Sequence, residues 1–140
     1  METNQVPAGG RIAVIEDDVP LRDALVLFLR VKGWSVDVFG SGEELAGIEN
    51  WGDFTVVICD FSLPHKDGIS VLRRVREVSD EVITVLLAPY PNADISALAE
   101  SAGVDRILYK PFSTRELVES LDSLAENRAS RRSIPFASPR

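Results

Sequence analysis

The chain has 140 residues, of which 45% are hydrophobic and 26% are charged. This length suits one compact domain with short tails, and this composition is far from the low hydrophobicity and high charge of disordered chains. The net charge of −7 is unevenly distributed, because residues 1–127 carry 11 basic and 22 acidic side chains while residues 128–140 add four arginines, so we expect residues 1–127 not to bind nucleic acid directly.

Residues 1–10 hold neither the basic nor the apolar stretch of a signal peptide, and no apolar run in the sequence is long enough to span a bilayer. The single cysteine, Cys59, has no partner for an internal disulfide, which is typical of the reducing cytoplasm. We expect Cys59 to be an ordinary core residue. The sequence predicts a cytoplasmic protein that does not engage a membrane.

The chain divides into three parts by composition. Residues 1–10 form an N-terminal lead, residues 11–126 alternate short apolar runs with amphipathic segments, and residues 127–140 are rich in Ser, Pro and Arg. We expect one folded domain over residues 11–126 and a flexible tail or linker over residues 127–140. Four arginines are weak support for a tail that contacts DNA or acidic lipid.

Five short apolar segments of this domain predict β-strands. Three of them contain nearly unbroken Val, Ile and Leu, which is typical of strands that helices cover on both faces. In chain order the predicted strands are Arg11–Glu16, Ser35–Phe39, Phe54–Asp60, Val82–Ala88 and Arg106–Lys110.

Amphipathic segments between these strands predict α-helices. Apolar side chains recur at helical spacing in residues 21–29 and 95–102. The alternation of strands and helices predicts an α/β fold with a doubly wound, five-stranded parallel sheet. The expected helix start and stop signals are the N-cap Asp18, the S-x-x-E capping boxes of Ser41 with Glu44 and of Ser113 with Glu116, and the terminating residues Gly33 and Gly103.

Charged side chains follow the predicted strands at their carboxyl ends. Glu16, Asp17 and Asp18 come after the first strand, Asp60 ends the third and Lys110 ends the fifth. Because the carboxyl ends of parallel strands meet at one edge of a sheet, these side chains are expected to converge. Clustered carboxylates repel one another unless a cation lies between them, and oxygen ligands alone favour Mg²⁺. The alternative role for such acids is that of helix N-caps, which we favour for Asp18 only.

Three motifs stand at these strand ends: I-E-D-D at Ile15–Asp18, C-D-F-S-L-P-H-K-D-G at Cys59–Gly68 and Y-K-P-F at Tyr109–Phe112. Together and at these spacings they are specific, and the chain resembles the receiver domains of two-component response regulators over residues 11–126. The resemblance implies a flavodoxin-like (βα)5 fold with strand order 2-1-3-4-5. It also implies a signalling protein of a phosphorelay and not an enzyme.

The resemblance assigns roles to the residues of this edge. It implies that Asp60 accepts a phosphoryl group from a sensor histidine kinase or a phosphotransfer protein. It implies that Lys110 pairs with the phosphoryl oxygens and that the Lys110–Pro111 peptide is cis. Phosphoryl transfer needs such a nucleophile, a metal and a further cation. The implied Mg²⁺ ligands are Glu16, Asp17, Asp60 and the backbone carbonyl of Ser62.

The chain departs from the family at its switch positions. Ala88 stands where receivers normally carry a Thr or Ser that bonds the phosphoryl group, and the next residue, Pro89, has no backbone N–H to donate. Ile107 stands where many members carry a Tyr or Phe. Two missing charge-assisted hydrogen bonds, each worth roughly 1.5–3 kcal/mol, would weaken the coupling between phosphorylation and conformation.

Two functions stay open. The first is a phospho-accepting receiver with an atypical switch. The second is a degenerate receiver that acts as a phosphorylation-independent interaction or dimerisation module, with a homodimer face built from the fourth helix, fifth strand and fifth helix. A phosphatase of the haloacid-dehalogenase type is disfavoured because it needs a second acid where Ser62 stands. A nucleotide-binding protein is disfavoured because acids, and not a glycine-rich loop, follow the first strand.

Overall fold

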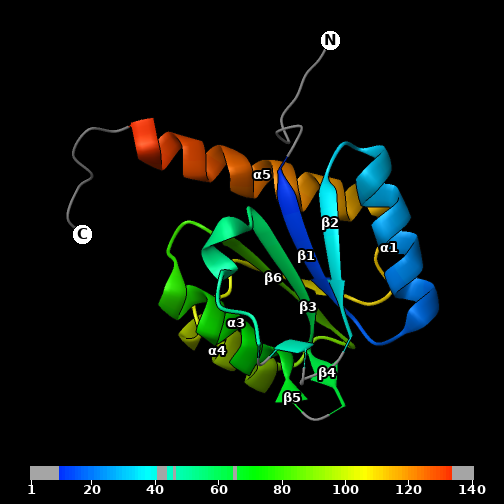
Figure 1. The fold of residues 1–140 in the computed structure, drawn as a ribbon. Helices are drawn as coiled ribbons and strands as arrows, with labels where there is room; N and C mark the ends of the chain where they lie inside the picture. Colours follow the sequence, from blue (N-terminus) through cyan, green and yellow to red (C-terminus); the bar gives the residue numbers. More distant parts are fainter. Residues whose placement is uncertain (1–9, 41–43, 46, 65, 134–140) are drawn as a thin grey trace.

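A five-stranded parallel sheet forms the centre of the protein (Figure 1). The computed structural model describes residues 10–40, 44–45, 47–64 and 66–133. Counted in chain order, the five strands of this sheet lie in the order 2-1-3-4-5, which confirms the predicted flavodoxin-like fold. The strands are β1 (Arg11–Ile15), β2 (Ser35–Phe39), β3 (Val56–Asp60), β6 (Ile83–Ala88) and β7 (Arg106–Tyr109).

Helices cover both faces of the sheet (Figure 1). On one face α1 and α5 bury leucines against β1, β3 and β6, and on the other face α3 and α4 pack with Trp51 of the short helix η1. Every residue of β3 and β6 is buried, as expected for central strands between two helical layers. The described helices are α1 (Val19–Val31), η1 (Trp51–Asp53), α3 (Gly68–Val78), α4 (Ala93–Ser101) and α5 (Thr114–Ser133).

The predicted helix signals are confirmed where the structure describes them. The Asp18 carboxylate accepts a hydrogen bond of 3.2 Å from a backbone N–H in the first turn of α1. Ser113 and Glu116 cap the start of α5 reciprocally, with hydrogen bonds of 2.9 and 3.0 Å. Gly33 and Gly103 have φ values of 104° and 82°, which only glycine adopts readily.

The helix start predicted by the Ser41 and Glu44 capping box falls on residues of which several lie outside the described part of the chain. Ser41, the first member of its capping box, is one of them, so this box stays a prediction. The other member, Glu44, accepts a hydrogen bond of 2.8 Å from the backbone N–H of Gly40.

Two features differ from the sequence-based expectations. Residues 127–133, expected to belong to a flexible tail, continue α5 to Ser133, because no Gly or Pro interrupts a run that is rich in helix-favouring residues. A short antiparallel hairpin, β4 (Ser62–Leu63) with β5 (Lys66–Asp67), follows β3. Within the described residues, no helix combines the length and the apolar character that crossing a membrane requires.

Candidate functional site

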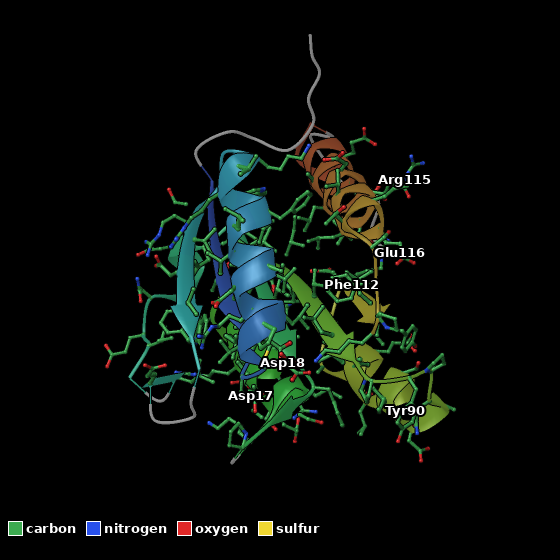
Figure 2. The ribbon with its side chains drawn as sticks, turned by 90° about the vertical axis from the view of Figure 1, so that its right-hand side faces the viewer. Asp17, Asp18, Tyr90, Phe112, Arg115 and Glu116 are labelled. Carbon is green, nitrogen blue, oxygen red and sulfur yellow. The ribbon has the colours of Figure 1, made fainter. Side chains whose placement is uncertain are left out.

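The predicted acids converge at the carboxyl edge of the sheet. Strands β1 and β3 are neighbours, with Ile15 beside Cys59, so Glu16 and Asp60 emerge side by side. Carboxylate oxygens of Glu16, Asp17 and Asp60 all lie within 4.8 Å of one another. Glu16 and Asp60 are buried, while Asp17 is exposed at the edge where α1 begins (Figure 2). The cluster therefore opens to solvent on the side of Asp17.

Lys110, the residue after β7, completes this cluster. Its Nζ lies 3.2 Å from Glu16 Oε1 and 3.2 Å from Asp60 Oδ1. The backbone N–H of Lys110 donates a hydrogen bond of 2.8 Å to the carbonyl of Ala88, which ties the residue to β6. The Lys110–Pro111 peptide is cis, as predicted. Burial opposes the positive charge, but the carboxylates of Asp60 and Glu16 outweigh it and raise the pKa of Lys110.

Glu16 is the most unusual group of the cluster. Its side chain is fully buried, and this burial, together with the charge of Asp60, raises its pKa from 4.5 to about 7, although the backbone N–H of Asp18 opposes the shift. Oε2 accepts that N–H at 3.1 Å, whereas Oε1 accepts no hydrogen bond within the described residues and meets Lys110 only as an ion pair. An under-bonded carboxylate oxygen among three acids fits a hard divalent cation such as Mg²⁺.

The segment after Asp60 folds back closely on the backbone of that residue. The N–H of Gly68 donates a hydrogen bond of 2.7 Å to the carbonyl of Phe61. A Cβ atom at Gly68 would lie 2.1 Å from the carbonyl oxygen of Asp60, so only glycine fits there. Asp67 accepts a hydrogen bond of 2.8 Å from the N–H of Ser70 and begins α3. The metal-ligand role of the Ser62 carbonyl, in the same hairpin, stays a prediction.

Gly68→Ala is expected to displace the backbone of Asp60 and to destabilise the protein by about 1–3 kcal/mol, the usual effect of overpacking. Urea unfolding measures the stability. Gly52→Ala is the matched control, because its Cβ would make only an ordinary contact of 3.8 Å with Ser79. Equal stability of the two variants would contradict the close approach of Gly68 to the backbone of Asp60.

The predicted switch positions lie on β6 and β7, and only Ala88 is adjacent to the acidic cluster. Ala88 is fully buried at the end of β6, next to the residue that pairs with Asp60. Ile107 is partly buried on β7 and packs against the core under α3 and α4. A contact absent from the sequence analysis lies nearby: the hydroxyls of Tyr109 and of Ser96 on α4 are 3.4 Å apart. No spacing in the sequence indicates this pair.

Two other residues of the Cys59–Gly68 motif carry reactive side chains. Cys59 is fully buried, and burial together with the charge of Asp60 raises the pKa of its thiol well above the ordinary value. This confirms the prediction of a core residue. His65, which belongs to the same motif as Asp60, lies outside the described part of the chain.

The sequence family can be assigned with this geometry in place. The family model of the response regulator receiver domain matches residues 12–122. The chain belongs to the response regulator receiver family. A crystal structure of a CheY-like receiver domain protein from Methanospirillum hungatei JF-1 superimposes on this receiver with a TM-score of 0.81, at 25% identity, over 89% of this chain and 99% of the other.

Longer regulatory proteins contain a similar domain. The transcriptional regulatory protein TrcR of Mycobacterium tuberculosis is 32% identical over 115 residues, which are 81% of this chain and 44% of TrcR. DltR of Streptococcus agalactiae is 32% identical over 108 residues, which are 77% of this chain and 48% of DltR. DrrB of Thermotoga maritima, an OmpR/PhoB homolog, has a TM-score of 0.76 at 27% identity, over 85% of this chain and 54% of DrrB. The receiver thus spans about half the length of the curated relatives it matches.

Proposed function

We propose that this receiver accepts a phosphoryl group on Asp60 from the phosphohistidine of a partner sensor histidine kinase or phosphotransfer protein. The observation that carries the proposal is the position of Lys110 Nζ, 3.2 Å from Asp60 Oδ1. A fixed cation beside a carboxylate nucleophile offsets the charge on the phosphoryl oxygens. The bond from phosphorus to the donor nitrogen breaks as the bond from phosphorus to an Asp60 oxygen forms.

Glu16, Asp17 and Asp60 are the proposed protein ligands of Mg²⁺, together with the backbone carbonyl of Ser62. The proximity of the three carboxylates and the under-bonded Oε1 of Glu16 support this ligand set. When bound, Mg²⁺ supplies neutralising charge to phosphoryl oxygens. Lys110 supplies a second positive charge from the carboxyl end of β7, and Asp17 faces the solvent through which a donor approaches.

The switch of this receiver is proposed to be atypical. Ala88 has no hydroxyl and Pro89 has no N–H, so neither can hold the phosphoryl group from the β6–α4 loop. These same residues favour the second candidate, a degenerate receiver that interacts with its partners independently of phosphorylation. Both candidates describe a signalling module and not an enzyme.

Incubation with acetyl phosphate and Mg²⁺ is expected to add one phosphate to the wild-type chain, measured by intact mass, because Lys110 and the acids surround Asp60. Asp60→Asn keeps the shape of this side chain and is expected to remain unmodified, as is wild type in excess EDTA. A wild-type chain without an adduct would support the degenerate receiver. An adduct without altered amide exchange in residues 88–103 would mean that phosphorylation does not move this region.

The proposal extends to the cellular location and the output of the receiver. We place it in the cytoplasm, where its kinase or phosphotransfer partner would phosphorylate it. The relatives named as transcriptional regulators support an output on DNA by a partner or an attached domain, while the acid-rich residues 1–127 do not bind DNA themselves.

A further inference from the structure

Helices α3 and α4 cover the face of the sheet opposite α1 and α5 (Figure 1). Side chains of α3, of α4 and of the segment before α3 line a groove on this face. Its volume is about 200 Å³, which is below the roughly 300–1,000 Å³ of pockets that enclose a drug-sized ligand. A single protruding side chain suits it better. Its lining is mainly apolar and consists of Phe61, Asp67, Ile69, Ser70, Arg73 and Leu98.

The rim of this groove carries an apolar side chain without a place in the core. Leu98 of α4 is 51% exposed. The other exposed residues of α4 are the small Ala93, Ala97 and Ser101 and the acidic Asp94 and Glu100. Leu98 therefore extends the apolar lining of the groove onto the outer side of α4.

Each of the two helices also carries a charged residue four positions away from one of its groove residues, and the two charges are opposite. Arg73 follows the groove residue Ile69 by four positions on α3, and Asp94 precedes Leu98 by four positions on α4. Arg73 and Asp94 are both exposed, and neither forms an ion pair within the described residues. Four residues correspond to about one helical turn, so the two intervals are equal in length, about 6 Å.

We propose that this α3–α4 face pairs with the same face of a second copy of the chain. When α4 of one copy lies antiparallel on α3 of the other, Leu98 enters the groove beside Ile69 while Asp94 meets Arg73. A two-fold axis repeats both contacts, as an isologous interface requires. This face carries the groove, the protruding Leu98 and the opposite charges of Arg73 and Asp94, so it is complementary to itself. The self-complementarity identifies a second copy as the occupant.

The homodimer face expected from the sequence, built by α4, β7 and α5, is less suited to this role. The surface depression there, on β7 and α5, is lined largely by polar and charged side chains, among them Arg106, Glu116 and Glu119. Arg106 already donates a hydrogen bond of 3.2 Å to Ser120 within the chain. The two faces share α4, so variants on α3 and on α5 distinguish them.

Sedimentation of the unphosphorylated full chain over a concentration series tests the proposal. Wild type is expected to form dimers, and Leu98→Glu is expected to weaken dimerisation about 30-fold or more, as for a central interface residue. Arg73→Asp and Asp94→Arg are each expected to weaken it, because each places like charges opposite one another. The double variant R73D/D94R is expected to dimerise more tightly than either single variant, which a merely structural role of these residues would not produce.

Glu119→Lys, on the α5 side, is the control that is expected to leave dimerisation unchanged. Circular dichroism establishes that each variant is folded. A wild-type chain that stays monomeric, a double variant no better than the single ones, or a dimer sensitive to Glu119→Lys but not to Leu98→Glu would overturn the proposal. None of these results depends on Asp60, so a failure here is distinct from a failure of the phosphorylation assay.

Discussion

Glu16→Gln is expected to raise the free energy of unfolding of the metal-free protein by about 3 kcal/mol above pH 7. Burial, with a contribution from the charge of Asp60, raises the pKa of Glu16 from 4.5 to about 7. One pKa unit corresponds to about 1.4 kcal/mol, so an ionised Glu16 destabilises the folded state by about 3 kcal/mol relative to the unfolded chain. Gln has nearly the same shape without the charge, and it removes this penalty.

The pH dependence of this effect has a definite sign. Between pH 4.5 and 7 the folded protein keeps on Glu16 a proton that the unfolded chain releases. The stabilisation by that proton is fully present below pH 4.5 and is lost as the pH rises through 7. The stability difference between variant and wild type is therefore expected to be small near pH 4.5 and to reach its full size above pH 7.

Urea unfolding in EDTA at pH 5 and at pH 8 measures this difference. Glu119→Gln, an exposed substitution of the same type on α5, is the matched control and is expected to change stability by less than about 0.5 kcal/mol. Added Mg²⁺ is expected to stabilise wild type more than Glu16→Gln, because a ligand that binds only the folded state stabilises it. A Glu16→Gln variant less stable than wild type at pH 8 in EDTA would contradict the destabilisation by the ionised Glu16 carboxylate.

The fold was largely predictable because its central strands are buried on both faces. Such strands consist of nearly continuous Val, Ile and Leu, and the predicted limits of β3 and β6 agree with the observed ones to within two residues. The β4–β5 hairpin was not predicted because its strands of two residues are too short for any periodicity. The end of α5 was not predicted because residues 127–133 combine a Ser- and Arg-rich composition typical of tails with the absence of Gly and Pro that lets a helix continue.

The candidate site was predictable as a set of residues but not as an electrostatic arrangement. The positions of Glu16, Asp60 and Lys110 follow from topology, since parallel strands end at one edge. The depth of Glu16 and its under-bonded oxygen depend on the direction in which the side chain leaves the strand. No sequence pattern encodes that direction, and it decides which carboxylate has the raised pKa.

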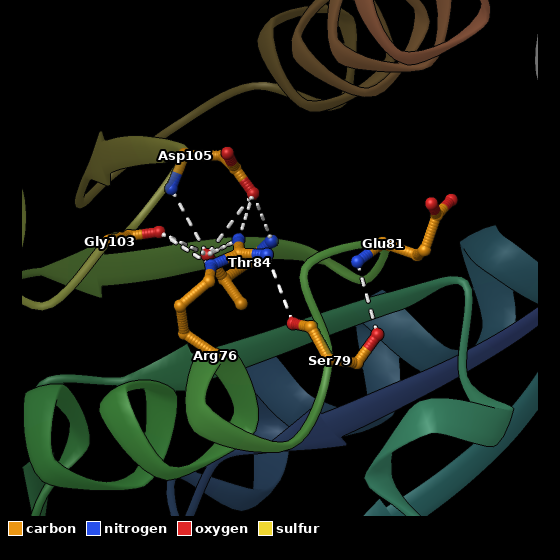
Figure 3. A network of polar contacts seen from close by, with 6 residues as sticks. All are labelled: Arg76, Ser79, Glu81, Thr84, Gly103 and Asp105. Atoms are coloured by element: carbon orange, nitrogen blue, oxygen red, sulfur yellow. Dashed lines mark hydrogen bonds and ion pairs between the residues drawn. The ribbon is translucent and has the colours of Figure 1, made fainter. Parts of the chain in front are cut away.

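A polar network on the opposite edge of the sheet gave no signal in the sequence (Figure 3). Arg76 of α3 forms an ion pair of 2.7 Å with Asp105, which precedes β7 and lies 29 residues away along the chain. The same guanidinium donates to the carbonyls of Gly103 and Ser79 and to the hydroxyl of Thr84, each at 3.2 Å. The network joins α3, β6 and the α4–β7 turn, so it fixes one end of the layer that carries α3 and α4.

Arg76→Met is expected to destabilise the protein by about 3 kcal/mol, the low end of the range for breaking a largely buried ion pair. The side chains of Arg76 and Asp105 are only 19% and 22% exposed. Methionine retains an apolar stem against Gly103, so the loss measures the guanidinium and not the packing. It leaves the Asp105 carboxylate with the hydrogen bonds from the N–H and hydroxyl of Thr84, at 2.9 and 3.3 Å, and removes its 2.7 Å ion pair with Arg76.

Urea unfolding of Arg76→Met against Arg74→Met separates this network from an ordinary surface pair. Arg74 is 64% exposed and contacts Glu77 only at 3.6 Å, so its loss is expected to change stability by less than about 1 kcal/mol. Asp105→Asn combined with Arg76→Met is expected to cost less than the sum of the single changes, since both changes remove the same interaction.

Thr84 lies near the amino end of β6 and Asp60 at the carboxyl end of β3, at opposite edges of the sheet. Arg76→Met is therefore expected to take up phosphate from acetyl phosphate like wild type under conditions in which it stays folded, and a defect in that assay would show that the two edges are coupled.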